Sequence, residues 1–165
     1  MKALISTLLT GAVLATAVLT GCHTIDDNRI PVAPVNIVFY SVADWDIYGV
    51  AGATSYRRFI RDERVPSNFP YTATTFTGYG GILLVSDVMG NPQAFDLSCP
   101  VEVKQTVRVA IDPETMLAKC PRCGSTYDVF SLLGSPVSGM AADRGYGLRH
   151  YHVSPSGSAY MVVSF

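Results

Sequence analysis

Three cysteines lie in two short loops of this 165-residue chain, at spacings that suit metal chemistry. The first loop reads Cys99-Pro100-Val101-Glu102, and the second reads Cys120-Pro121-Arg122-Cys123. Both loops place ligand-capable side chains at positions i and i+3, which is the spacing of a zinc knuckle, with a glutamate in place of one cysteine. The candidate metal ligands are therefore Cys99, Glu102, Cys120 and Cys123, and the candidate ions are zinc or a single iron. An exposed Glu102 with no metal role is the simpler alternative.

The second loop continues as Gly124-Ser125-Thr126-Tyr127-Asp128. With the first loop, this stretch resembles the two cluster-binding loops of the Rieske iron–sulfur family, C-x-H and C-P-x-H-G-S-x-F/Y-D. The resemblance extends over residues 35–165 and is clearest from residue 78 onward. It implies an all-β fold: a Rieske-like antiparallel sandwich or barrel with a small cysteine-loop subdomain. It also implies cofactor binding by Cys99, Cys120 and Cys123.

Both histidines that ligate iron in Rieske proteins are absent, because Val101 and Cys123 stand at their positions. Valine has no donor atom, so at most three ligands remain and an intact Rieske [2Fe–2S] centre is not expected. If the two loops face each other as in the Rieske fold, Cys99 could instead form a disulfide with Cys120 or Cys123. Such a bond would close a loop of about twenty residues and stabilise the fold by roughly 3 kcal/mol. One thiol would then remain free.

Other chemistry-bearing residues give weaker signals. His150 and His152 share one parity of a predicted strand and could supply missing ligands, although cross-strand or surface partners are the more common role of such residues. Ser125 is not accompanied by the nucleophile elbow of a hydrolase. An enzyme is therefore not the favoured reading.

Short apolar runs separated by turn residues predict the strands that must position these loops. The runs cover residues 35–40, 82–85, 93–97 and 158–165. Alternating valines predict a further strand over residues 101–111. Many short strands with turns between them are typical of an all-β sandwich or barrel.

The segment before residue 81 is harder to interpret. Tyr56, Phe59 and Ile60 have helical spacing, and Ser55 could cap the short helix that this spacing predicts. The glycine-rich residues 78–81 are not followed by the helix and Lys-Ser or Lys-Thr of a phosphate-binding loop. They predict a tight turn into a buried strand instead.

The first residues predict a destination for the protein. Met1-Lys2 is followed by an uncharged apolar stretch that ends in Leu19-Thr20-Gly21-Cys22. This pattern predicts a secretory signal peptide over residues 1–21, and its end matches the bacterial lipobox, which predicts lipidation of Cys22. An uncleaved membrane helix is the alternative. Residues 22–34 are predicted to be a tether and residues 35–165 the domain.

These features predict a lipoprotein of the bacterial cell envelope, anchored to the membrane through lipid on Cys22. His23 favours the outer membrane, on either its periplasmic or its surface face. The net charge of −1 argues against a nucleic-acid partner. The expected function is non-enzymatic, with a disulfide or a metal ion holding the cysteine loops. The alternative is an envelope electron-transfer protein that carries a [2Fe–2S] cluster or mononuclear iron to a redox partner.

Overall fold

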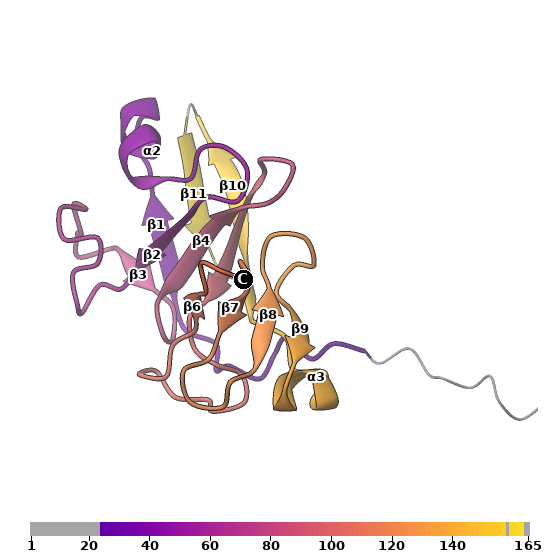
Figure 1. The fold of residues 1–165 in the computed structure, drawn as a ribbon. Helices are drawn as coiled ribbons and strands as arrows, with labels where there is room; N and C mark the ends of the chain where they lie inside the picture. Colours follow the sequence, from indigo (N-terminus) through magenta and orange to yellow (C-terminus); the bar gives the residue numbers. More distant parts are fainter. Residues whose placement is uncertain (1–23, 158, 164–165) are drawn as a thin grey trace, which may run out of the picture.

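The computed structural model describes residues 24–157 and 159–163 (Figure 1). The predicted signal peptide and Cys22 lie outside these residues. No helix in the described part is long and apolar enough to cross a bilayer. The helices are α2 (Val42–Tyr48) and α3 (Met140–Arg144). The strands are β1 (Val35–Val38), β2 (Tyr56–Phe59), β3 (Phe76–Thr77), β4 (Ile82–Ser86), β5 (Pro92–Asp96), β6 (Ala110–Ile111), β7 (Ala118–Lys119), β8 (Thr126–Asp128), β9 (Ser135–Ser138), β10 (His150–Ser156) and β11 (Ala159–Val163).

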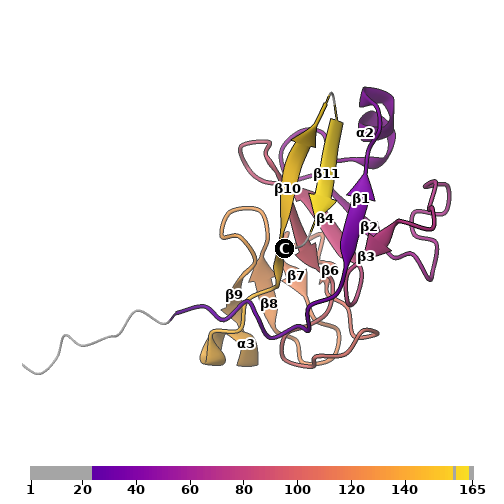
Figure 2. The same cartoon turned by 180° about the vertical axis from the view of Figure 1, so that it is seen from behind.

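The fold is all-β, as predicted, and its strands form two antiparallel units. The larger sheet has seven strands in the order β2-β4-β5-β10-β11-β1-β3, and the smaller has four in the order β6-β7-β8-β9. β10 joins the two halves of the larger sheet, because His150 and Tyr151 pair with β5 and the following residues pair with β11. The smaller sheet, with α3 at its end, lies at one end of the molecule and α2 at the other (Figures 1 and 2).

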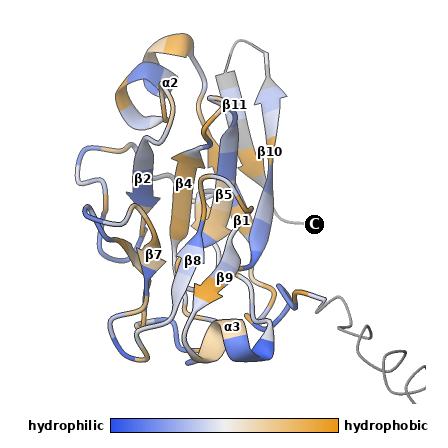
Figure 3. Cartoon of the chain, turned by 45° about the vertical axis from the view of Figure 1, so that its right-hand side comes forward, coloured by the Kyte–Doolittle hydropathy of each residue, from blue (hydrophilic) through white to orange (hydrophobic). Residues whose placement is uncertain are grey.

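Strand β4 is buried along its whole length and separates two cores. Side chains alternate across a strand, so Ile82 and Leu84 face a core built on β1 and an aromatic group around Phe69. Leu83 and Val85 face the other way, into a core that contains Cys99 and Cys120. Figure 3 shows most of β4 as hydrophobic. The cysteine loops are therefore packed against the centre of the larger sheet.

Most of the predicted strands are confirmed, but two local predictions are wrong. Residues 56–59 form strand β2 rather than a helix, because Tyr56 to Phe59 pair residue by residue with β4. The helix in this half is α2, where the Ser41 hydroxyl accepts a hydrogen bond from the Asp44 N–H at 3.0 Å. The predicted strand over residues 101–111 is reduced to β6, because turns precede it and Val103 adopts a positive φ of 51°.

The described part of the predicted tether lies against the domain. Asp26 forms a bridge with Tyr146, just after α3. Ile30 is fully buried. Residues 26–30 are called the strap below, since they hold the chain to the domain before β1 begins.

Candidate metal centre

The two predicted loops bring their three cysteines together. The Sγ atoms of Cys99, Cys120 and Cys123 all lie within 4.8 Å of one another. Those of Cys99 and Cys123 are 3.6 Å apart. A disulfide needs an S–S distance of about 2.05 Å, so the predicted disulfide is not formed in this structure, where all three residues are free thiols.

Main-chain hydrogen bonds shape the two loops. Cys99 follows β5, and its N–H donates to the Val107 carbonyl at 3.0 Å while its carbonyl accepts from Val103 at 2.9 Å. Cys120 follows β7, and its N–H donates to the Ser125 carbonyl at 2.9 Å. Gly124 closes the turn with a φ of 72°, a conformation that favours glycine. These turns point the cysteines toward one another instead of along the strands.

Two hydroxyl groups lie next to the sulfurs. The Tyr127 hydroxyl is 3.5 Å from Cys99 Sγ, and the Ser125 hydroxyl is 3.3 Å from Cys123 Sγ. Ser125 is fully buried and also accepts a hydrogen bond from the Ala141 N–H of α3 at 3.2 Å. The small helix is thereby connected to the cysteine loops.

The thiols differ in their electrostatics. Burial raises the pKa of Cys99 to about 12, although a hydrogen bond with Tyr127 opposes the shift. Burial also opposes ionisation of Cys123, but hydrogen bonds with the Ser125 hydroxyl and main chain, and with the neighbouring thiols, lower its pKa below the usual value. Burial and the adjacent Cys99 raise the pKa of Tyr127, which keeps its hydroxyl protonated. A thiolate at Cys99 therefore needs a nearby positive charge.

Glu102 is placed differently from the three cysteines. Its Oε2 atom lies 3.1 Å from Arg122 Nε, in an ion pair between the two loops. The donor atoms that lie within 4.8 Å of one another are the three sulfurs, and the Glu102 carboxylate is outside this group. Three of the four predicted metal ligands thus converge, and the fourth joins the loops through a salt bridge.

The set of donor atoms fits one metal ion better than a two-iron cluster. Tetrahedral thiolates at about 2.3 Å from zinc stand about 3.8 Å apart, close to the 3.6 Å that separates Cys99 and Cys123. A Rieske cluster needs four ligands on two irons. Val101 offers no donor atom and packs against the core beside the cysteines. The residues present therefore do not fit an intact Rieske centre.

The two histidines do not join the sulfurs. His150 Nε2 lies 2.9 Å from Gln93 Oε1, and its ring lies 5.2 Å from that of Phe95. Neither His150 nor His152 belongs to the group of converging donors among the described residues. His150 on β10 therefore has a cross-strand partner, Gln93 on β5, which is the role predicted as the more common one.

The sequence interpretation did not identify Asp96, which is fully buried next to the cysteine loop. Its carboxylate accepts hydrogen bonds from the N–H groups of Tyr79, Gly80 and Ser98 and from the Tyr151 hydroxyl. The glycine-rich residues 78–81 are thus a tight turn into buried β4, as predicted. The signal available in the sequence was an acidic residue between the apolar residues Phe95 and Leu97.

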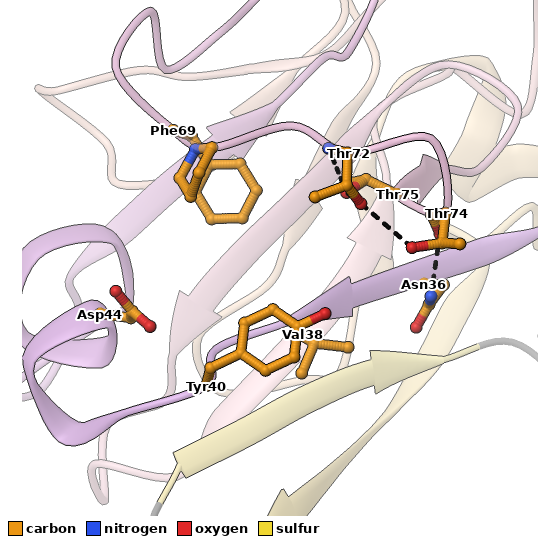
Figure 4. A pocket seen from close by; sticks show the side chains of 9 residues that line it. Asn36, Val38, Tyr40, Asp44, Phe69, Thr72, Thr74 and Thr75 are labelled. Carbon is orange, nitrogen blue, oxygen red and sulfur yellow. Dashed lines mark hydrogen bonds between the residues drawn. The ribbon is translucent and has the colours of Figure 1, made fainter.

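Two hollows lie away from the sulfurs. The one in Figure 4, beside β1, has a volume near 20 Å³. Its polar groups bond one another: Thr72 and Thr75 hydroxyls lie 3.0 Å apart, and Asn36 donates to the Thr74 carbonyl at 2.9 Å. A wider polar cleft beside residues 78–81 contains Arg108, which is paired with Glu63. Neither hollow includes a cysteine, so the three-sulfur cluster is the stronger candidate site.

Comparison with known proteins gives no match to a family model, a curated protein or a solved structure.

Proposed function

We propose that the protein is a lipid-anchored domain of the bacterial cell envelope that binds one metal ion through Cys99, Cys120 and Cys123. The ion holds the two cysteine loops together, and the role is structural or binding rather than enzymatic. The convergence of the three sulfurs within 4.8 Å carries this proposal. The anchor rests on the Leu19-Thr20-Gly21-Cys22 motif alone.

Zinc is the ion that this site suits best. Thiolates are soft ligands that favour zinc among the common divalent ions. A bound cation deprotonates a coordinating thiol outright, which offsets the burial that raises the pKa of Cys99. With Val101 lacking a donor, the fourth position falls to a water molecule or another small ligand.

A relation to the Rieske family remains part of the proposal. It is supported by the loop motifs and by a four-stranded unit that carries the second cysteine loop beside a larger sheet. In this proposal the domain keeps the scaffold and replaces the two-iron centre with a single ion.

Metal analysis combined with a thiol count tests the proposal. Protein purified without oxygen should contain one metal ion per chain, and a chelator should release three reactive thiols in the folded domain. Cys99→Ser and Cys123→Ser should each lose the ion. One reactive thiol and no metal would instead establish a disulfide and refute the metal proposal.

Electron transfer through iron at the same cysteines is the second candidate. The hydroxyl groups of Tyr127 and Ser125 next to the sulfurs favour it, because hydrogen bonds to ligand sulfurs tune the potential of an iron centre. Iron-loaded protein should then show a reversible one-electron signal that shifts in Tyr127→Phe. If the signal is absent, or if it persists in Cys120→Ser, this candidate is excluded.

A further inference from the structure

The strap fixes the start of the domain to the segment after α3. The Asp26 N–H donates to the Gly145 carbonyl at 2.7 Å, and the Asp26 carbonyl accepts from the Gly147 N–H at 2.9 Å. This pair of bonds is a short parallel bridge. Asp26 is therefore the first residue of the described chain that pairs with the main chain of the domain.

Arginine side chains hold the rest of the strap. Arg149 donates from Nε to the Ile30 carbonyl at 2.8 Å and from Nη2 to the Asn28 carbonyl at 3.1 Å. The guanidinium of Arg29 lies over the Tyr146 ring, 4.4 Å from its centre. With Ile30 fully buried, the strap is part of the folded domain and not a free linker.

Docking of the strap leaves little free chain between Asp26 and the proposed lipid on Cys22. Four residue steps span at most about 14 Å. A domain of this size has a radius of gyration of about 14 Å, so the tether is no longer than that radius. The side of the domain where the strap leaves must then stay next to the membrane, and the opposite edge cannot reach it.

The elements on that side carry exposed apolar residues. In Figures 1 and 2 the chain leaves the domain beside β9 and α3, while β3 lies at the opposite edge. Ile25 sits against Gly147, whose neighbour Leu148 donates to the Gly134 carbonyl next to the β8–β9 loop. Ile25, just before the strap, is one of these exposed apolar residues, and this loop, β9 and α3 carry Leu132, Leu133, Val137 and Met140.

We propose that this side, which is called the β9–α3 face, rests directly on the lipid bilayer and inserts its apolar side chains at the interface. The inference rests on the proposed lipidation of Cys22. The strap carries Asp26, Asp27 and Arg29, and α3 carries Asp143 and Arg144. Because these charges are of both signs, the contact is apolar and does not select anionic lipids. The cysteine loops, which Ser125 joins to α3, then lie at the membrane end of the domain.

Quenching of tryptophan fluorescence by lipids brominated in their acyl chains tests this orientation. Trp45, the single tryptophan of the chain, lies on α2, far from the β9–α3 face. The lipidated full chain is placed in brominated phosphatidylcholine vesicles. In a Trp45→Phe background, Leu133→Trp is compared with a matched control, Phe76→Trp on β3; the two native side chains are 60% and 42% exposed.

The Leu133→Trp signal should fall roughly twofold, because side chains at such interfaces sit about 5–10 Å into the boundary. The Phe76→Trp signal and wild-type Trp45 should not change, and 0.5 M salt should have no effect. Met140→Trp replaces Leu133→Trp if the latter unfolds.

The possible failures are distinguishable. If the protein floats with the vesicles but Leu133→Trp and Phe76→Trp respond alike, the orientation is overturned and the anchor stands. If wild type floats no better than Cys22→Ser, the anchor fails and the orientation fails with it. Metal content, measured separately, bears only on the cysteine site.

Discussion

A Cβ atom at Gly80 would lie 1.9 Å from Ser98 Oγ and 2.9 Å from the Ser98 main-chain nitrogen. No side chain fits at position 80, because the turn into β4 runs directly against the segment that leads to Cys99. The two segments share one carboxylate, Asp96, which accepts from both of their N–H groups.

Gly80→Ala should therefore lower the free energy of unfolding by about 1–3 kcal/mol, the usual effect of overpacking. Ser98→Gly in the same chain should recover part of the loss, since the hydroxyl is removed and the main-chain contact remains. Urea unfolding of the two single variants and the double variant measures this. If the effects of Gly80→Ala and Ser98→Gly on the free energy of unfolding simply add, the Ser98 hydroxyl is not what excludes a side chain at position 80.

Asp96→Asn should destabilise the fold more than Tyr151→Phe. Hydrogen bonds to a charged group contribute about 1.5–3 kcal/mol each. Tyr151→Phe removes one hydrogen bond to the Asp96 carboxylate, whereas Asp96→Asn removes the charge and so weakens all of them. Thermal unfolding of both variants gives the order, with Thr126→Ala, which removes one hydrogen bond between uncharged hydroxyl groups, as the control. Equal losses would mean that the main-chain donors contribute little.

Glu102→Gln should retain the metal ion. The carboxylate is paired with Arg122 and lies outside the group of converging sulfurs, so removing its charge disrupts the pair and not a metal bond. Arg122→Gln is the matched control. Loss of the ion in Glu102→Gln alone would restore the glutamate as the fourth ligand.

The pKa of His150 should be found below its ordinary value of about 6.5. Partial burial of the ring is the main cause, and a positive His152 adds to it while Asp27 opposes it. A lowered pKa means that folding favours the neutral ring. The free energy of unfolding should thus decrease as pH falls below 6.5, until the folded-state pKa is passed. NMR titration gives the pKa, and His150→Gln should remove this part of the pH dependence.

Arg149→Ala should release the strap without unfolding the domain. The change removes two hydrogen bonds from a charged donor. If they contribute about 1.4 kcal/mol, the Asp26 and Gly147 amides should exchange about tenfold faster. Arg144→Ala, an exposed neighbour on α3, is the control. Unchanged exchange in Arg149→Ala would mean that the Asp26 bridge, the Arg29 contact with Tyr146 and the buried Ile30 hold the strap without Arg149.

The strands that the sequence predicted well are those whose apolar residues face a core. Residues 82–85 are a continuous apolar run because both faces of β4 are buried, and the turn at Gly90 leads back into β5. Strand β2 was missed because its burial is uneven, with Tyr56 exposed and Phe59 buried. Its partner β4, and not its own pattern, determines its conformation.

The cysteine site could be predicted in its residues but not in its geometry. The loop motifs placed Cys99, Cys120 and Cys123 together, whereas the distance between their sulfurs depends on turns such as that at Gly124. The valine alternation over residues 101–109 was misleading. Val101 packs against the core from a turn, and Val107 packs against it next to an isolated bridge between Arg108 and Ser98. The alternation therefore indicated burial but not a continuous strand.

The bond from Arg149 to the Ile30 carbonyl joins residues 119 positions apart, compared with 24 for Cys99 and Cys123. In an open chain the longer closure loses about 1.4 kcal/mol more conformational entropy. Local hairpins and the cysteine loops should consequently form early in folding, and the strap should dock late, as should β1, whose Ile37 pairs with Val162 on β11. A chain whose Cys22 is already held at a bilayer would then complete its folding by drawing this last-formed part of the domain down onto the lipid.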